Sequence, residues 1–251
     1  MNAVVAFCQL LGDRPSQQDY ADYRVLDLSA GLESYYLALA DGMGGESFGF
    51  LAADLAIKAF LNLPVDHRVV DRKFLLSSIE RINQALAASI RENPQQHGMG
   101  VSFLAATVVG GVLSWVSVGD SPLYLYQGGT LRRLNQDHSM LPILSKMVKK
   151  GQLSEAEIAS DPRRGILRSC IKGESSPLID VQVDFLKLEP RDLIILASDG
   201  INTLSEQALL SVLDSSWELS VDGIAKKVLE KVQDHASPNQ DNASAMIYRF
   251  L

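Results

Sequence analysis

The sequence predicts a mixed α/β protein in which two packed antiparallel sheets carry helices on their outer faces. Three observations support this prediction. Blocks of strand-like segments alternate with two pairs of helix-like segments. Most neighbouring strand-like segments are separated by short turns, a spacing that favours antiparallel pairing. The helix-like segments carry apolar stripes that need cover, which two packed sheets with helices outside them would provide.

The first half of the chain predicts three strands, two helices and a hairpin. The strands are expected at Val4–Leu11, Tyr23–Leu28 and Tyr35–Ala40, and the helices at Ser47–Leu61 and Asp71–Arg91. No charged residue occurs from Gly98 to Gly119, which is long enough for a membrane span. The pair Gly110-Gly111 divides this stretch into two β-rich runs, so we interpret it as a buried hairpin and expect no membrane span.

The second half predicts a second hairpin, a flap and a further set of strands and helices. Its elements are expected at Leu123–Tyr126 and Thr130–Leu134 (hairpin), Met140–Lys150 and Ser154–Ser160 (short helices of a flap at about 139–176), Leu178–Leu188 and Asp192–Ala197 (strands), Ser205–Leu213 and Val221–Asp234 (helices), and Ala243–Phe250 (last strand). Ser154 and Glu157 form a capping-box pattern. No Pro/Gly/Ser linker divides the chain, so we expect a single domain over residues 1–251.

Composition narrows the range of functions. The formal net charge of −7 argues against a nucleic-acid binder, which usually has a basic face. Cys8 and Cys170 are far apart and form no CxxC pair, so a structural zinc site is not expected and both are interpreted as reduced packing residues. The first residues resemble a strand more than a signal peptide. We therefore expect a cytoplasmic protein.

Five aspartates lie at the predicted strand boundaries. Asp41 and Asp199 directly follow strands, Asp241 precedes the last strand, Asp120 closes the first hairpin, and Asp19 lies in the loop after the first strand. Two carboxylates about 4 Å apart repel by roughly 4 kcal/mol at an effective dielectric constant near 20. If the aspartates converge, either their pKa values rise or they bind hard cations such as Mg²⁺ or Mn²⁺. The alternative is that each aspartate caps a separate turn.

Six motifs, taken in order along the chain, resemble those of the metal-dependent Ser/Thr protein phosphatases of the PP2C (PPM) family. They are Gly12-Asp13-Arg14 with Gln17-Gln18-Asp19, Asp41-Gly42-Met43-Gly44-Gly45, Val118-Gly119-Asp120-Ser121, Gln136-Asp137-His138-Ser139, Ala197-Ser198-Asp199-Gly200, and Asp241-Asn242. The segment Val148–Ile171 resembles the flap of bacterial members. This resemblance implies an α/β/β/α sandwich with a two-metal centre at one end.

The resemblance also implies roles for individual residues. Asp41 would bridge two Mn²⁺ or Mg²⁺ ions, and the Gly42 carbonyl would bind one of them. Asp199 and Asp241 would bind the other ion, and Asp19 would act mainly through metal-bound water. Asp120, with Asp199, would contribute to a weaker third metal position. Arg14 would clamp the substrate phosphate, so Arg14, Asp41 and Asp199 are the expected catalytic residues.

The expected activity is hydrolysis of phosphoserine and phosphothreonine in proteins by a metal-activated water, with a cognate Ser/Thr kinase as the opposing partner. Two alternatives remain: a weakly active scaffold that binds phosphoproteins, and a hydrolase of a small phosphate ester. Gln18 favours the scaffold, because the family often has Glu there and its loss removes one charge from the outer metal shell. Met43 stands where eukaryotic members often have the His suggested as the general acid. His138 is interpreted as a structural hydrogen-bonding residue.

Overall fold

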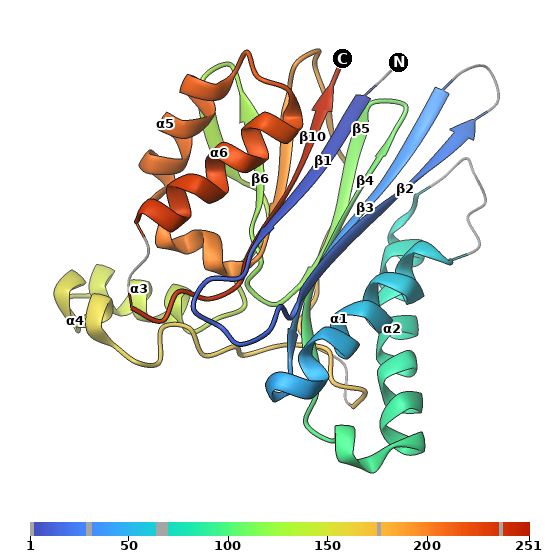
Figure 1. Ribbon diagram of the computed structural model, residues 1–251, viewed down its shortest axis with the longest axis vertical. Helices are drawn as coiled ribbons and strands as arrows, with labels where there is room; N and C mark the ends of the chain where they lie inside the picture. Colours follow the sequence, from blue (N-terminus) through green and yellow to red (C-terminus); the bar gives the residue numbers. More distant parts are fainter. Residues whose placement is uncertain (1–2, 29–31, 64–69, 175–176, 236–237) are drawn as a thin grey trace.

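The computed structural model describes residues 3–28, 32–63, 70–174, 177–235 and 238–251. Its ten strands form two five-stranded antiparallel sheets, drawn side by side in Figure 1. The first sheet has the order β1 (Ala3–Leu10), β10 (Ala243–Phe250), β9 (Leu193–Ala197), β6 (Leu123–Gln127) and β7 (Thr130–Arg133). The second has the order β2 (Asp19–Leu28), β3 (Leu32–Met43), β4 (Gly100–Val109), β5 (Val112–Val118) and β8 (Asp180–Lys187).

Two helix pairs cover the outer faces of the sheets. Helices α1 (Gly45–Leu61) and α2 (Arg72–Glu92) pack on the second sheet, and α5 (Glu206–Ser216) and α6 (Val221–Asp234) pack on the first. A third apolar layer fills the space between the sheets. Within the described residues, no helix has both the length and the apolar character that crossing a membrane requires.

The period-two alternation of β3 decides which way its last carboxylate faces. Ala38 and Ala40 lie in the apolar layer under α1 and α2, whereas Leu37 and Leu39 lie in the layer between the sheets. Successive strand side chains point to opposite faces. Asp41 therefore faces the space between the two sheets, at the end of the strand.

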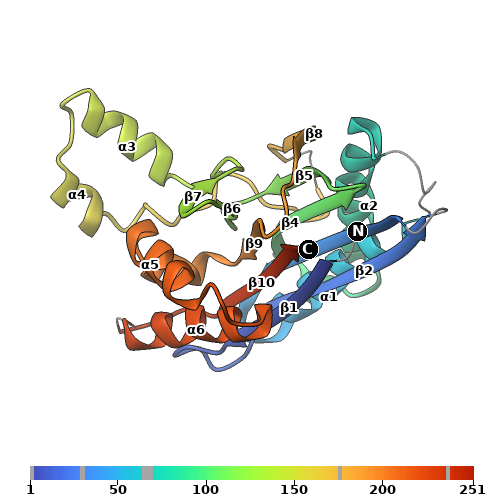
Figure 2. The ribbon, with the colours of Figure 1, turned by 90° about the horizontal axis from the view of Figure 1, so that it is seen from above.

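A flap projects beside this end of the sandwich, as Figure 2 shows. It contains α3 (Leu141–Lys149) and α4 (Glu155–Ser160), and α4 begins with the predicted capping box of Ser154 and Glu157. Two short 3₁₀ helices, η1 (Pro94–Gln96) and η2 (Asp199–Thr203), complete the chain order. Ser175 and Ser176, at the end of the predicted flap, lie outside the described residues.

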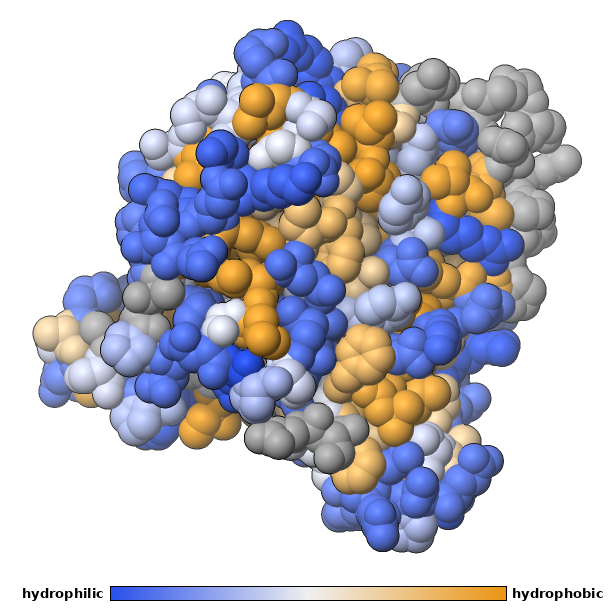
Figure 3. All heavy atoms as spheres, viewed as in Figure 1, coloured by the Kyte–Doolittle hydropathy of each residue, from blue (hydrophilic) through white to orange (hydrophobic). Residues whose placement is uncertain are grey.

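One surface of the molecule carries an edge strand of each sheet, β1 and β2. Figure 3 shows apolar residues scattered among hydrophilic ones on the face where β1 and β2 run. Val4 of β1 and Tyr23 and Val25 of β2 are among the exposed large apolar residues of these edge strands.

The two-sheet prediction is confirmed, and both Gly-Gly hairpins form as expected. Two placements were wrong. Asp41 does not follow β3 but belongs to it, because pairing with β4 continues to Met43. Asp19 does not lie in a loop, because it is the first residue of β2 and pairs with Asp41 across the ladder.

Candidate active site

Asp41 and Asp199 form the centre of the carboxylate cluster. Asp41 comes from β3 and Asp199 from the first position of η2, directly after β9, so each sheet supplies one of them. The two carboxyl groups lie close enough for the charge of Asp199 to raise the pKa of Asp41, and Asp199 Oδ1 is buried without a hydrogen-bond partner among the residues that the structure describes. Two buried carboxyl groups this close are stable only when a proton or a cation offsets their repulsion.

The pKa values of both groups reflect this crowding. Loss of water raises the pKa of Asp41 well above its usual range, and the charge of Asp199 adds to the shift. Loss of water, followed by the charges of Asp120 and Asp241, raises the pKa of Asp199 to about 8. An all-oxygen site with this excess of negative charge suits a hard divalent cation such as Mg²⁺ or Mn²⁺. The residues therefore fit the ions that the motifs imply.

Two serines hold the buried carboxylate of Asp19. Ser198 Oγ donates to Asp19 Oδ2 at 2.7 Å, and Ser244 Oγ donates to the same oxygen at 2.6 Å. The Ser244 amide donates in turn to Ser198 Oγ at 2.9 Å, and Gln9 Nε2 donates to Ser244 Oγ at 3.2 Å. Burial raises the pKa of Asp19 to about 6 although both hydroxyls lower it. Asp19 begins β2 of one sheet, whereas Ser244 lies in β10 of the other sheet and Ser198 directly follows β9, so these bonds join the two sheets at the site.

Sequence reasoning missed this pair of serines. It assigned roles only to the nearby aspartates Asp199 and Asp241. The available signal was that Ser198 directly precedes Asp199 and Ser244 lies in the last strand close to Asp241. It became interpretable only with the register of β9 and β10, which places both hydroxyls beside one oxygen.

Arg14 and Asp241 are paired with each other. Arg14 Nη2 lies 2.6 Å from Asp241 Oδ2, and both side chains are partly exposed. Asp13 fixes the two loops, because its amide donates to the Gln240 carbonyl at 2.8 Å and its Oδ2 accepts from the Asn239 and Gln240 amides. The motifs suggested separate roles in phosphate and metal binding for Arg14 and Asp241. The structure places the two groups close enough to exchange partners.

The carboxylates of the site have separate partners. Among the residues that the structure describes, no three carboxylate, imidazole or thiolate groups are gathered tightly enough to hold one ion. Asp41 lies close to Asp199, Asp19 accepts hydrogen bonds from two serines, and Asp241 pairs with Arg14. The structure thus brings Asp41 and Asp199 together and holds Asp241 against Arg14.

Asp120 lies on the flap side of the cluster. Loss of water and the charge of Asp137 raise the pKa of Asp120 to about 6. Arg133, which sequence reasoning did not single out, donates from Nη2 to the Asp120 carbonyl at 2.8 Å and pairs with Asp137 at 3.4 Å. His138 Nδ1 accepts from the Gly119 amide at 3.2 Å, which confirms the structural role predicted for His138.

A cleft of about 720 Å³ opens in front of these groups. Its lining includes the carboxylates Asp120, Asp199 and Asp241 and, from the flap region, Ser139, Leu141, Ile158 and Arg164. The cleft is large enough for a phosphorylated side chain and the residues next to it.

Comparisons with known proteins identify the family. The chain matches none of the protein-family models. A protein of Streptococcus pyogenes serotype M6 described as "protein phosphatase 2C-type" is 30% identical over 186 residues, which cover 72% of this chain and 73% of the relative. The chain belongs to the PP2C (PPM) family.

Solved structures agree with this assignment. The S. agalactiae serine/threonine phosphatase is 26% identical with a TM-score of 0.81 over 100% of both chains. The catalytic domain of the serine/threonine protein phosphatase PstP, solved in complex with 2 manganese ions, is 24% identical with a TM-score of 0.75 over 99% of both chains. The latter likeness is one of fold.

Gln18, which departs from the usual PP2C motif, makes contacts that suit an amide. Its Nε2 donates to the Gly45 carbonyl at 2.6 Å, while its backbone carbonyl accepts from the Gly42 amide at 3.1 Å. Gly49 of α1 leaves the space for this side chain, because a Cβ there would lie 2.6 Å from Gln18 Cδ. A glutamate could not donate to Gly45.

Gln18→Glu should therefore lower the stability of the metal-free protein and raise its affinity for Mn²⁺. We expect the metal-free variant to lose about 1 kcal/mol of unfolding free energy, because a carboxylate would face the Gly45 carbonyl. The added charge should tighten Mn²⁺ binding by about five-fold. Thermal unfolding and calorimetric Mn²⁺ titration measure the two effects. Gln207→Glu, on the exposed surface of α5, is the matched control. Unchanged Mn²⁺ affinity in Gln18→Glu would contradict the expectation.

Proposed function

We propose that this PP2C member is a metal-dependent protein serine/threonine phosphatase. The observation that carries the proposal is the proximity of the buried carboxyl groups of Asp41 and Asp199, which come from different sheets, together with the cleft that Asp199 lines. Evolutionary relatives named as serine/threonine phosphatases support the substrate class. Mn²⁺ or Mg²⁺ would be the cofactor, with two ions and a weaker third position beside Asp120.

Some residues of the site would hold the cations, and others would hold the phosphate. Asp41, Asp199 and Asp241 would hold the ions with the Gly42 carbonyl, and Asp19 would act through bound water. Gly42 must be glycine, since a Cβ there would lie 1.9 Å from the Gly49 carbonyl oxygen. The bound ions would lower the pKa of a water molecule and stabilise developing negative charge.

Arg14 would bind the phosphate of the substrate. Its guanidinium already faces the cluster and is paired with the carboxylate of Asp241. If Asp241 held a cation, the donors of Arg14 would be free for a phosphate, which guanidinium groups bind in a bidentate manner. Before substrate binds, the carboxylate of Asp241 therefore balances the positive charge of Arg14.

The rest of the assignment follows from this activity. The partners would be phosphorylated proteins and an opposing Ser/Thr kinase, and the location would be the cytoplasm. We also propose that residues 1–251 act as one domain, because both sheets contribute to one site.

Hydrolysis of a phosphothreonine peptide and of p-nitrophenyl phosphate, each with Mn²⁺ and with EDTA, tests the proposal. We expect turnover of both substrates with Mn²⁺ and a loss of at least about 10³-fold in EDTA, because water needs activation to attack a phosphate monoester. Full activity in EDTA would refute the metal mechanism. Binding of a phosphopeptide without turnover would favour a scaffold, and turnover of small esters alone would favour a metabolite hydrolase.

A further inference from the structure

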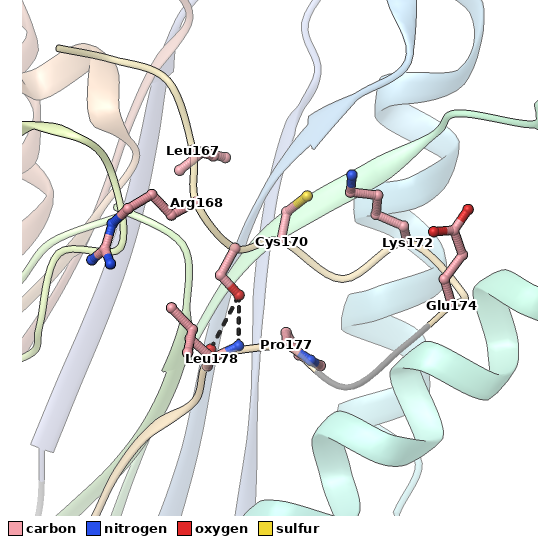
Figure 4. Close-up of a pocket in the computed structure, with 8 residues that line it drawn as sticks. Leu167, Arg168, Cys170, Lys172, Glu174, Pro177 and Leu178 are labelled. Atoms are coloured by element: carbon pink, nitrogen blue, oxygen red, sulfur yellow. Dashed lines mark hydrogen bonds between the residues drawn. The ribbon is translucent and has the colours of Figure 1, made fainter. Parts of the chain in front are cut away.

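A second pocket lies outside the catalytic cleft. Figure 4 shows its lining, and its volume is about 260 Å³. Leu167, Leu178 and Pro177 give it apolar walls, and its polar residues are Arg168, Ser169, Cys170, Lys172 and Glu174. Because sites for small molecules usually exceed about 300 Å³, this pocket suits a single side chain.

Strand register places the pocket close to the carboxylate cluster. Ile171 bridges to Val101 of β4, and Val101 pairs with Gly42 of β3. Each step between neighbouring strands is about 4.8 Å, so Ile171 lies about 10 Å from Gly42 across the sheet. An extended peptide advances about 3.3 Å per residue, so three residues span this distance.

The pocket also opens on the same face as the cluster. Ile171 and Val101 belong to the apolar layer under α1 and α2. By alternation, Cys170 and Lys172 face the other way, as Asp41 does. Gly100 leaves space for them, since a Cβ there would lie 3.3 Å from Lys172 Cγ and 3.7 Å from Cys170 Sγ. One substrate chain could therefore reach both places.

The charges of the pocket favour an anion. Arg168 and Lys172 line it, and neither forms an ion pair with any residue that the structure describes. Arg168 Nε donates to the Ser139 carbonyl at 2.8 Å, which anchors the side chain and leaves its two terminal nitrogens available. Glu174 is the one carboxylate among the described lining residues. Figure 4 shows the Arg168 guanidinium and the Lys172 ammonium on opposite sides of Cys170, so the lining carries two separate cations against one carboxylate in a chain of net charge −7.

We propose that this pocket binds an anionic side chain of the substrate polypeptide, a carboxylate or a second phosphate, about three residues from the phosphorylated residue. The inference rests on the proposed phosphatase function and adds a sequence preference to it. Lys172 supplies the charge, and Arg168 supplies a fixed pair of donors beside the cleft residue Ser139.

Paired phosphothreonine peptides test this preference. Each pair differs only by glutamate or glutamine at one position, two to four residues before or after the phosphothreonine. We expect kcat/KM to favour glutamate by about five-fold at one of these positions, as for a charged contact near a surface. The preference should weaken with added salt. A peptide with a second phosphothreonine at that position distinguishes the two anions.

Charge reversal separates recognition from structure. Lys172→Glu should remove the glutamate preference and favour a lysine peptide instead, while Lys172→Arg should keep the original preference. Lys73→Glu, on the exposed surface of α2, adds the same charge change elsewhere and should leave the preference intact. The ratio between two peptides on one preparation cancels differences in folding and metal loading.

These experiments distinguish a failure of the pocket inference from a failure of the proposed phosphatase function. Wild-type protein that hydrolyses p-nitrophenyl phosphate and peptides without preferring glutamate at any position would overturn the inference alone. So would a preference that survives in Lys172→Glu. Absence of turnover on every phosphate substrate would overturn the phosphatase proposal, and the pocket inference with it.

Discussion

Asp199→Asn is expected to abolish Mn²⁺-dependent phosphatase turnover, with a loss of about 10³-fold or more in kcat/KM. Removal of a single hydrogen-bond donor from an active site costs about 10²–10³-fold, and a ligand to the activating cation should cost at least as much. The Asp199 carboxyl lies close to that of Asp41, and its Oδ1 has no hydrogen-bond partner in the part of the chain that the structure describes. An amide in its place lacks the charge that a cation needs.

The same substitution should stabilise the metal-free protein. An asparagine amide can donate to the Asp41 carboxyl group and removes one of the repelling charges. The melting temperature at pH 8 should therefore rise, by about 2–4 °C for each kcal/mol gained. Asp222→Asn, on α6 and paired with Lys226, is the matched control and should change neither property substantially. Wild-type turnover in Asp199→Asn would remove this residue from the list of metal ligands.

Mn²⁺ should stabilise the protein more at pH 8 than at pH 6. The pKa values of Asp41 and Asp199 are raised in the folded protein, that of Asp199 to about 8, from an ordinary value of 3.8. The folded protein therefore holds protons that the unfolded chain releases. This contribution to stability is complete below about pH 3.8 and is lost as the pH rises towards 8.

Mn²⁺ replaces these protons and competes with them at lower pH. With free Mn²⁺ at about 100 times its dissociation constant, binding adds about 2.7 kcal/mol, which corresponds to a rise of about 5–10 °C in melting temperature. Thermal unfolding in EDTA and in Mn²⁺ at pH 6, 7 and 8 measures the difference. A Mn²⁺ shift that is independent of pH, or larger at pH 6, would contradict this expectation. Asp199→Asn should show a smaller pH dependence than the wild type.

Local patterns in the sequence were sufficient to predict most of the fold. The apolar stripe and its caps placed α2 within one residue of both observed ends, and the Gly-Gly pairs marked both hairpins. Strand ends were predicted less well, because the ladder partner decides where a strand stops. β2 extends back to Asp19 since it pairs with β3 as far as Asp41.

Only part of the candidate site, too, could be predicted from local patterns in the sequence. The sequence indicated that Asp41 and Asp199 lie at strand ends, but their proximity depends on how the two sheets pack, because β3 and β9 belong to different sheets. The pairing of Arg14 with Asp241 could not be predicted, since it depends on how two loops lie against each other. The serines around Asp19 and the role of Arg133 likewise depend on contacts between distant segments, for which no local pattern exists.

The interleaved strand order has a consequence for biosynthesis. β1, made first, finds its neighbour only in β10, and β9 must be in place to carry Asp199. A nascent chain can thus pair β2 to β5 early, with Asp19 and Asp41 already aligned, and still have no working centre, because β8, β9 and β10 follow later. Catalytic competence arises only once translation has delivered β10.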